Sequence, residues 1–304
     1  MKIPKFYEHS FDAMGSPCRL SFYAHTYPAA QHAISLAVTE ITRLETKYSR
    51  YRPNSLLSKI NQVAACGGLI EVDEETASLL DYSAACYEDS SGLFDITSGL
   101  FHKIWKPTNT TFPDSDRIKQ VRSFVGWEKL VWASPKLQFP HPGLELDLGG
   151  IVKEYAADCV AEILSNQGIE HGVINLGGDI HVLGPHPDGK PWLVGIQHPR
   201  REGSALRFLE VLRGAVASSG DYERCAIING VRYSHIINPI TGSPVSHLAS
   251  VTVISELCVV AGSISTIAML KEDKGPDWLE TQGEPHWWMD SEGKEGGSLL
   301  PNPL

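Results

Sequence analysis

Residues 218–244 constrain the fold of this chain more than any other stretch, because they read as a β-hairpin with a defined turn. Two short apolar runs flank Asn229 and Gly230, the dipeptide that best fits the positive φ angles of a type I′ turn. The return strand leads to His235, and an Asn-Pro and Thr-Gly turn sequence follows. The hairpin therefore delivers a histidine, whose ordinary pKa lies near neutrality, to a tight loop. Rigid strands that present a titratable group on a loop commonly build functional sites.

Helix and strand patterns alternate irregularly along the rest of the chain. Residues 30–48 carry apolar side chains at steps of three and four, which predicts an amphipathic helix. Asp73 is a predicted N-cap for a second helix that runs toward Asp89. A last helix is predicted at about residues 258–271.

The pattern between residues 173 and 253 is rich in strands, with no internal repeat and no linker. We therefore predict an α+β fold with mixed, antiparallel-rich sheets and packed helices. Residues 1–290 are expected to form a single domain. The composition of residues 291–304 predicts a flexible tail.

A glycine turn introduces the clearest helix. A predicted strand at residues 144–148 precedes Gly149 and Gly150, and Gly168 is placed to end the helix that follows. Lys153 lies in its first turns, where backbone N–H groups, the helix dipole and the lysine could together hold a phosphate. A solvated surface lysine is the alternative. The residues expected on one face of this helix are Ile151, Tyr155, Cys159 and Ile163.

Charge and cysteine usage narrow the class of protein. A net charge of −10 without a basic run argues against nucleic acid or an anionic membrane as partner. The six cysteines form no CxxC pair, which argues against a zinc site or redox dithiol and for reduced thiols. No stretch approaches the roughly 18 apolar residues of a membrane span, and the N-terminus lacks a signal-peptide pattern. We therefore predict a cytoplasmic protein without membrane insertion.

Taken together, the motifs resemble the ApbE-type flavin transferases (FAD:protein FMN transferases). The resemblance holds in order and spacing from about residue 11 to residue 290. The matching blocks are residues 13–16, residues 48–53 with Ser55, Ser58 and Asn61, and residues 92–97, 146–158, 175–179, 219–221 and 234–244.

The resemblance implies an enzyme that moves FMN from FAD onto a Thr or Ser hydroxyl of an acceptor flavoprotein and releases AMP, usually with Mg²⁺. It implies that His235 is the general base for the acceptor hydroxyl. It also implies that Gly150, through its carbonyl, and Thr266, through its hydroxyl, hold the metal. The residues expected to line the FAD site are Met14, Tyr51, Phe94, Asp95, Asp147, Lys153 and Ile237.

Two of these side chains have an ordinary structural alternative. Asp95 lies beside Thr97 in a turn, where an aspartate is more often a local cap than a ligand contact. Thr266 could instead bond back to the carbonyl four residues earlier in its helix.

The chain departs from the family pattern at two positions. Gly262 stands where the family usually has a metal-binding Asp, and Glu154 stands where glycine commonly follows the lysine. We hypothesise that Glu154 or Glu256 supplies a substitute carboxylate, because Mg²⁺ prefers at least one. Two other functions stay open: an FAD pyrophosphatase that yields FMN and AMP, and a non-catalytic FAD-binding protein, which the missing Asp favours.

Overall fold

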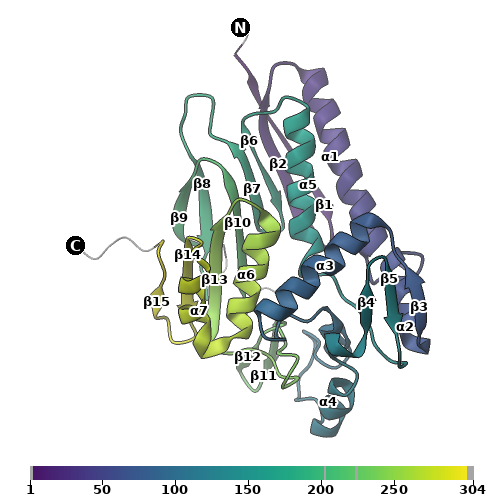
Figure 1. The fold of residues 1–304 in the computed structure, drawn as a ribbon. Helices are drawn as coiled ribbons and strands as arrows, with labels where there is room; N and C mark the ends of the chain where they lie inside the picture. Colours follow the sequence, from purple (N-terminus) through teal and green to yellow (C-terminus); the bar gives the residue numbers. More distant parts are fainter. Residues whose placement is uncertain (1–2, 202, 223–224, 300–304) are drawn as a thin grey trace.

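An eight-stranded antiparallel sheet runs through the molecule, seen in a computed structural model that describes residues 3–201, 203–222 and 225–299 (Figure 1). Its N-terminal strands form a hairpin at one edge, and the C-terminal strands form the other edge. In order across the sheet, the strands are β1 (Lys5–Ala13), β2 (Ser16–Ala24), β6 (Gly172–Leu176), β7 (Asp179–Gly184), β10 (Gly214–Gly220), β13 (Leu248–Ser255), β14 (His286–Asp290) and β15 (Glu295–Gly296).

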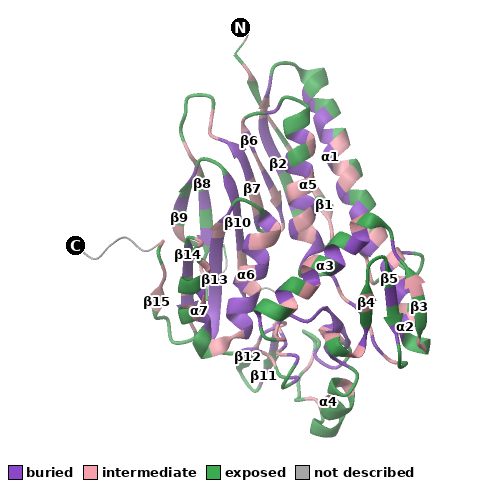
Figure 2. Cartoon of the chain, viewed as in Figure 1, coloured by how far each residue is buried: buried purple, intermediate pink, exposed green. Residues whose placement is uncertain are grey.

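Helices cover one face of this sheet, and many residues of its central strands are buried (Figure 2). These helices are α1 (Tyr27–Tyr48), α5 (Val152–Asn166) and α6 (Cys258–Leu270), with α7 (Gly275–Gln282) packed against α6. The opposite face carries the hairpin of β8 (Trp192–Gln197) and β9 (Ala205–Val211), whose Val194 and Leu209 form a separate core with the fully buried Trp287. The predicted α+β fold with antiparallel-rich sheets is confirmed.

Smaller elements extend the fold beyond the main sheet (Figure 1). One group joins α2 (Leu56–Cys66) and α3 (Glu74–Asp89) to a three-stranded sheet of β3 (Gly68–Glu71), β5 (Lys136–Phe139) and β4 (Val131–Ala133). The lower end in Figure 1 holds the β11–β12 hairpin and α4. The remaining elements are the 3-10 helices η1 (Ile96–Lys103), η2 (Trp127–Lys129) and η3 (Glu272–Lys274), α4 (Ser115–Arg122), β11 (Ala226–Ile228) and β12 (Val231–Tyr233).

The main local predictions are confirmed. The helices expected at residues 30–48 and 258–271 are α1 and α6. The Asp73 carboxylate caps α3 by accepting a hydrogen bond from Thr76 N at 2.9 Å. The predicted hairpin joins β11 and β12, with positive φ angles of 52° at Asn229 and 80° at Gly230.

One expectation around α5 was wrong. Residues 144–148 do not pair as a strand, because the Asn61 amide bonds both the N–H and the carbonyl of Leu146. Of the four residues predicted on one face of α5, Ile151 is fully buried and the other three are half-buried, with Tyr155 and Cys159 packed against the core. Since α5 packs against α1, α6 and strands of the sheet together, its small residues take the closest contacts. Its buried residues are Val152, Glu154, Ala156, Ala157, Val160, Ala161 and Leu164.

The residues that follow β14 add one more strand to the edge of the sheet. In the range predicted as a flexible tail, β15 pairs with β14 through Glu295 and Gly296. Leu299 donates its N–H to the His286 carbonyl at 3.0 Å and packs against the core behind the sheet. Residues 291–299 are thus part of the folded domain, and the rest of the predicted tail lies outside the described residues.

All six cysteines are unpaired in the structure, and Cys18, Cys86 and Cys258 are buried among apolar side chains. Within the described part of the chain, none of the helices has the length and apolar character needed to cross a membrane.

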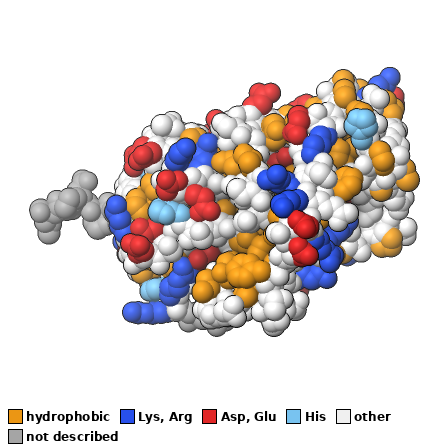
Figure 3. Space-filling model, turned by 90° about the horizontal axis from the view of Figure 1, so that it is seen from below, with side chains coloured by type: hydrophobic (Ala, Val, Ile, Leu, Met, Phe, Trp, Pro, Cys, Tyr) orange, Lys and Arg blue, Asp and Glu red, His pale blue; other side chains and the backbone are white. Residues whose placement is uncertain are grey.

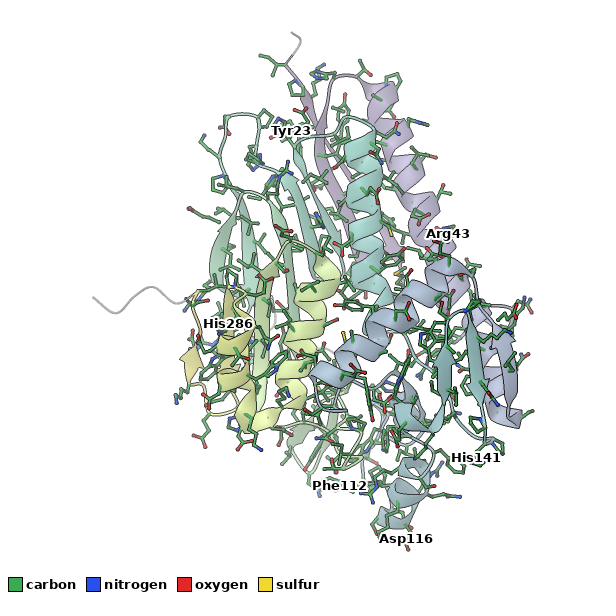
Figure 4. The ribbon with its side chains drawn as sticks, viewed as in Figure 1. Tyr23, Arg43, Phe112, Asp116, His141 and His286 are labelled. Atoms are coloured by element: carbon green, nitrogen blue, oxygen red, sulfur yellow. The ribbon has the colours of Figure 1, made fainter. Side chains whose placement is uncertain are left out.

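An ionic network around Glu75 ties three helices together. At the start of α3, its carboxylate accepts hydrogen bonds from Arg43 Nη2 at 2.5 Å and Lys47 Nζ at 2.6 Å, both on α1. Figure 4 labels Arg43 on α1 beside the start of α3. The Tyr155 hydroxyl of α5 donates to the same carboxylate at 3.4 Å. The hydrogen bonds from Arg43, together with Lys47, lower the pKa of Glu75 to about 2.

Glu75→Gln should lower the free energy of unfolding at pH 7 by about 1 kcal/mol, the upper end for solvent-accessible ion pairs. Because the folded-state pKa is depressed, this contribution is present above the ordinary pKa of a glutamate. It should disappear as the pH falls toward about 2. Urea unfolding at several pH values measures it. The matched control is Glu74→Gln, which removes an exposed carboxylate from the same turn. Equal effects of the two variants at pH 7 would contradict this role.

Candidate active site

His235 lies in a loop that local hydrogen bonds hold in shape. It follows β12, and its neighbour Ser234 accepts a hydrogen bond from Ile236 N at 3.0 Å. Across the loop, Val245 N donates to the Ile236 carbonyl at 3.0 Å. The imidazole is half-buried and its Nδ1 is fully buried, so the backbone and packing both limit its orientation.

The same loop is anchored to η1 and to Trp105 just beyond its end. Trp105 Nε1 donates a hydrogen bond to the Gly242 carbonyl at 2.8 Å. Ile237 is buried against Leu100, Phe101 and Trp105. The predicted FAD-lining residue Ile237 is therefore a core residue that fastens the His235 loop, and its contact with FAD stays a prediction.

An aromatic group borders this loop at the lower end of the molecule. The ring of Tyr233, two residues before His235, lies 4.9 Å from the ring of Phe112 between centroids. Figure 4 labels Phe112 at this end. Seen from below, acidic, basic and hydrophobic side chains are interspersed over this face (Figure 3).

Phe94 and Asp95 directly precede η1. Asp95 caps this helix: its Oδ1 accepts from Thr97 N at 2.8 Å and its Oδ2 from Trp127 N at 3.1 Å. Burial raises the pKa of Asp95. The local-cap alternative is thus confirmed, and a contact between Asp95 and FAD stays a prediction. Phe94 is buried, and its ring lies next to the backbone of Gly150.

Asp147 connects three chain segments at the start of α5. Its Oδ2 lies 2.5 Å from Arg50 Nη1, just beyond the end of α1. Its Oδ1 accepts from Gly149 N at 2.9 Å, and its own N–H donates to the Ile96 carbonyl of η1 at 2.7 Å. The glycine turn before α5 is therefore held by side-chain and backbone bonds together. Tyr51, next to the ion pair, is 82% exposed, and the Arg50 guanidinium lies over its ring, 5.2 Å from the centroid.

Met14 lies in the turn between β1 and β2. Its φ of 52° is rare for a residue that is not glycine, and Gly15 follows with 71°. A surface pocket of ≈ 350 Å³ opens beside this turn. The residues lining it are Asp12, Ala13, Gly15, Ser16, Pro17 and Glu45.

Lys153 lies where the turn between β1 and β2 approaches residues 177–179, which lead into β7. Its Nζ lies 2.7 Å from Asp179 Oδ2. A Cβ on Gly177, with φ 63°, would lie 3.6 Å from Lys153 Nζ and only 2.5 Å from Ser16 Cβ. Burial raises the pKa of Asp179, while the positive charge of Lys153 acts to lower it. The lysine is thus held at the junction of three elements and is more than a solvated surface residue.

The predicted metal-binding helix faces a buried glutamate. Glu154 Oε2 has no hydrogen-bond partner among the described residues. Burial, with a smaller effect of the Asp179 charge, raises the pKa of Glu154 to about 8. On α6, Thr266 Oγ1 lies 2.9 Å from the Ser219 hydroxyl of β10, and Ser265, rather than Thr266, bonds back to the Gly262 carbonyl.

The oxygen donors on these residues are of the types that a hard cation such as Mg²⁺ prefers. Among the described residues there is no group of three or more His, Cys, Asp or Glu side chains placed to hold a metal. Mg²⁺ does not require one, because one or two carboxylates with other oxygen atoms and substrate phosphates suffice. The unpartnered oxygen of Glu154, the Thr266 hydroxyl and the Gly150 carbonyl are donors of that kind.

The comparisons with known proteins agree with this architecture. The ApbE family model matches residues 14–286. The FAD:protein FMN transferase of Vibrio cholerae serotype O1 is 32% identical over 248 residues, 78% of this chain and 74% of that protein. The corresponding protein of Haemophilus influenzae is 31% identical over 253 residues, 78% of this chain and 72% of that protein.

Solved structures agree as well. The apbe protein of Thermotoga maritima has a TM-score of 0.87 at 29% identity, with 97% of each chain covered. Flavin transferase ApbE from Vibrio cholerae has a TM-score of 0.86 at 27% identity, with 97% of this chain and 98% of that chain covered. The chain belongs to the ApbE family, an enzyme family, and this prediction is confirmed.

Sequence reasoning did not include Arg50, Asp179 or Ser219 among the site residues, although each lies inside a motif block. The structure adds them through their contacts with Asp147, Lys153 and Thr266. The available signal for Asp179 was its place directly after Gly177 and Gly178, within the motif block at residues 175–179. The Arg50 contact joins residues far apart in the sequence, so no local pattern indicates it.

Gly177→Ala should destabilise the protein by at least about 1 kcal/mol more than Gly178→Ala. Both glycines have positive φ angles, 63° and 99°, so both variants strain the backbone. Only the Cβ at position 177 would also meet Ser16, while that at position 178 has nothing within 4 Å. Urea unfolding compares the two, and equal losses would mean that the turn relaxes without cost.

Proposed function

We propose that this protein transfers FMN from FAD to a Thr or Ser hydroxyl of an acceptor flavoprotein and releases AMP. The observation that carries the proposal is the convergence of the motif blocks at the start of α5, in a chain of the ApbE family. The names of the Vibrio and Haemophilus relatives support the same reaction.

His235 is the proposed general base. It accepts the proton of the acceptor hydroxyl as that oxygen attacks the phosphorus attached to the FMN half of FAD. A new P–O bond to the acceptor oxygen forms, the P–O bond that links the FMN phosphorus to the AMP phosphate breaks, and AMP leaves with the electron pair of that bond. The proton then passes from the imidazole to solvent. A half-buried histidine on a fixed loop suits this role, because its orientation is set before the substrates bind.

The other predicted residues bind and orient FAD in this proposal. Tyr51 stacks on a ring, Phe94 and Met14 supply apolar contact, and Asp147 accepts hydrogen bonds. Lys153 supplies positive charge near the phosphates, which is the main requirement of phosphoryl-type transfer besides positioning.

Mg²⁺, held by the Gly150 carbonyl and the Thr266 hydroxyl, would neutralise negative charge on the FAD phosphates. The proposed setting is the cytoplasm, which the free thiols support. The acceptor is a protein partner, and neither nucleic acid nor membrane insertion is part of the proposal.

His235→Ala should lower the rate of FMN transfer by at least about a hundredfold, the ordinary contribution of a general base. The protein is incubated with FAD, Mg²⁺ and a flavin-accepting domain, and the acceptor's intact mass is followed over time. His141→Ala, a change at an exposed histidine on the β5 side of the molecule, is the control and should be unaffected. Undiminished transfer by His235→Ala would remove His235 from its role.

The same incubation separates the other functions. AMP released without an acceptor, at the rate seen with one, would identify an FAD pyrophosphatase. Bound FAD with no AMP under either condition would identify a carrier protein. Both results would contradict the proposed transfer.

A further inference from the structure

The space beside Gly262 on α6 is occupied by a side chain from α5. A Cβ built on Gly262 would lie 2.7 Å from Cγ of Glu154 and 3.2 Å from its Cδ and Oε1. Contacts below 3.0 Å do not occur between unshifted atoms, so a side chain at position 262 and Glu154 in this conformation exclude each other. The two departures from the family pattern therefore meet at one place in the fold.

Glu154 is an acid in an unusual place. The residue is only 8% exposed, and its Oε2 finds no hydrogen-bond partner among the described residues. A buried polar atom without a partner is rare in native proteins and needs a physical reason, of which an ion is one. The nearby Lys153 forms an ion pair with Asp179, so the local positive charge already has a partner.

The position of the Glu154 carboxylate relative to α6 indicates why its oxygen is left without a hydrogen-bond partner. Gly262 and Thr266 are four residues apart on α6 and lie on the same side of the helix. A carboxylate that reaches the space next to Gly262 from α5 therefore lies on the side of α6 that carries the Thr266 hydroxyl. The Cβ of an aspartate at position 262 would point into the same space.

We propose that Glu154 supplies from α5 the metal-binding carboxylate that α6 lacks at Gly262. The inference rests on the proposed function for the identity of the ion. Relative to the family pattern, the carboxylate would have moved from α6, where this chain has Gly262, to α5, where it has Glu154 in place of glycine. It also decides between the two candidates from the sequence, because Glu256 is exposed in the turn before α6 and Glu154 supplies the atoms nearest to the Gly262 position.

Metal binding is tested separately from catalysis. Mn²⁺, which accepts the same oxygen ligands, is titrated into purified full-length protein with FAD present, and free Mn²⁺ is counted by electron paramagnetic resonance. Glu154→Gln should weaken Mn²⁺ binding at least about tenfold while FAD binding, followed by flavin fluorescence, persists. Glu162→Gln, which removes an exposed acid from the same helix, should bind Mn²⁺ as the unmodified protein does.

A second pair of variants keeps the inference testable should Glu154→Gln fold poorly. Gly262→Asp alone should lose stability, because its side chain meets Glu154. The double variant Glu154→Gly with Gly262→Asp should recover the stability and bind Mn²⁺ within a few-fold of the unmodified protein. Additive losses in the double variant would overturn this move of the carboxylate from α6 to α5.

The outcomes separate the inference from the proposed function. Unchanged Mn²⁺ affinity in Glu154→Gln, or no Mn²⁺ binding by the unmodified protein, overturns the role of Glu154. FMN transfer by the unmodified protein would in that case still support the transferase. Conversely, Mn²⁺ bound through Glu154 without any FMN transfer would retain the metal site and reject the transferase.

Discussion

The ion pair between Arg50 and Asp147 is the contact on which the candidate site depends. It joins the end of α1 to the glycine turn before α5, and the Asp147 N–H extends the connection to η1. At Gly99 of η1, a Cβ would lie 2.6 Å from Asp147 Cβ, so this approach leaves no room for a side chain. Because the turn is fixed from both sides, α5 starts at one defined place. Lys153 and Glu154 take their positions from that start.

Charge around the start of α5 is arranged at some cost to stability. Lys153 and Asp179 form a pair with little solvent, and Glu154 is buried near them. Buried charges stabilise a fold poorly, because the loss of hydration offsets much of their attraction. Their cost is consistent with a functional role, since perturbed acids and bases concentrate where ligands bind. The Glu75 network at the other side of α5 is more exposed to solvent and holds helices together instead.

The sequence predicted much of the local structure because local physics decides it. The Asn229 and Gly230 turn, the Asp73 cap and the apolar spacing of α1 depend on residues within a few positions of one another. The same reasoning went wrong where a distant partner intervened. Asn61 takes the hydrogen bonds of Leu146 that a strand would have used. The buried face of α5 is set by the helices and strands around it.

The site divides in the same way. By itself, the sequence determined the residue types, the family and the loop that carries His235, because motifs and turns are local patterns. It also revealed the missing aspartate at position 262, but left two glutamates as possible substitutes. Only the tertiary structure decided between them, by placing the Glu154 side chain in the space that Gly262 leaves open. The distance between two helices far apart in the chain is set by packing, and no sequence spacing encodes it.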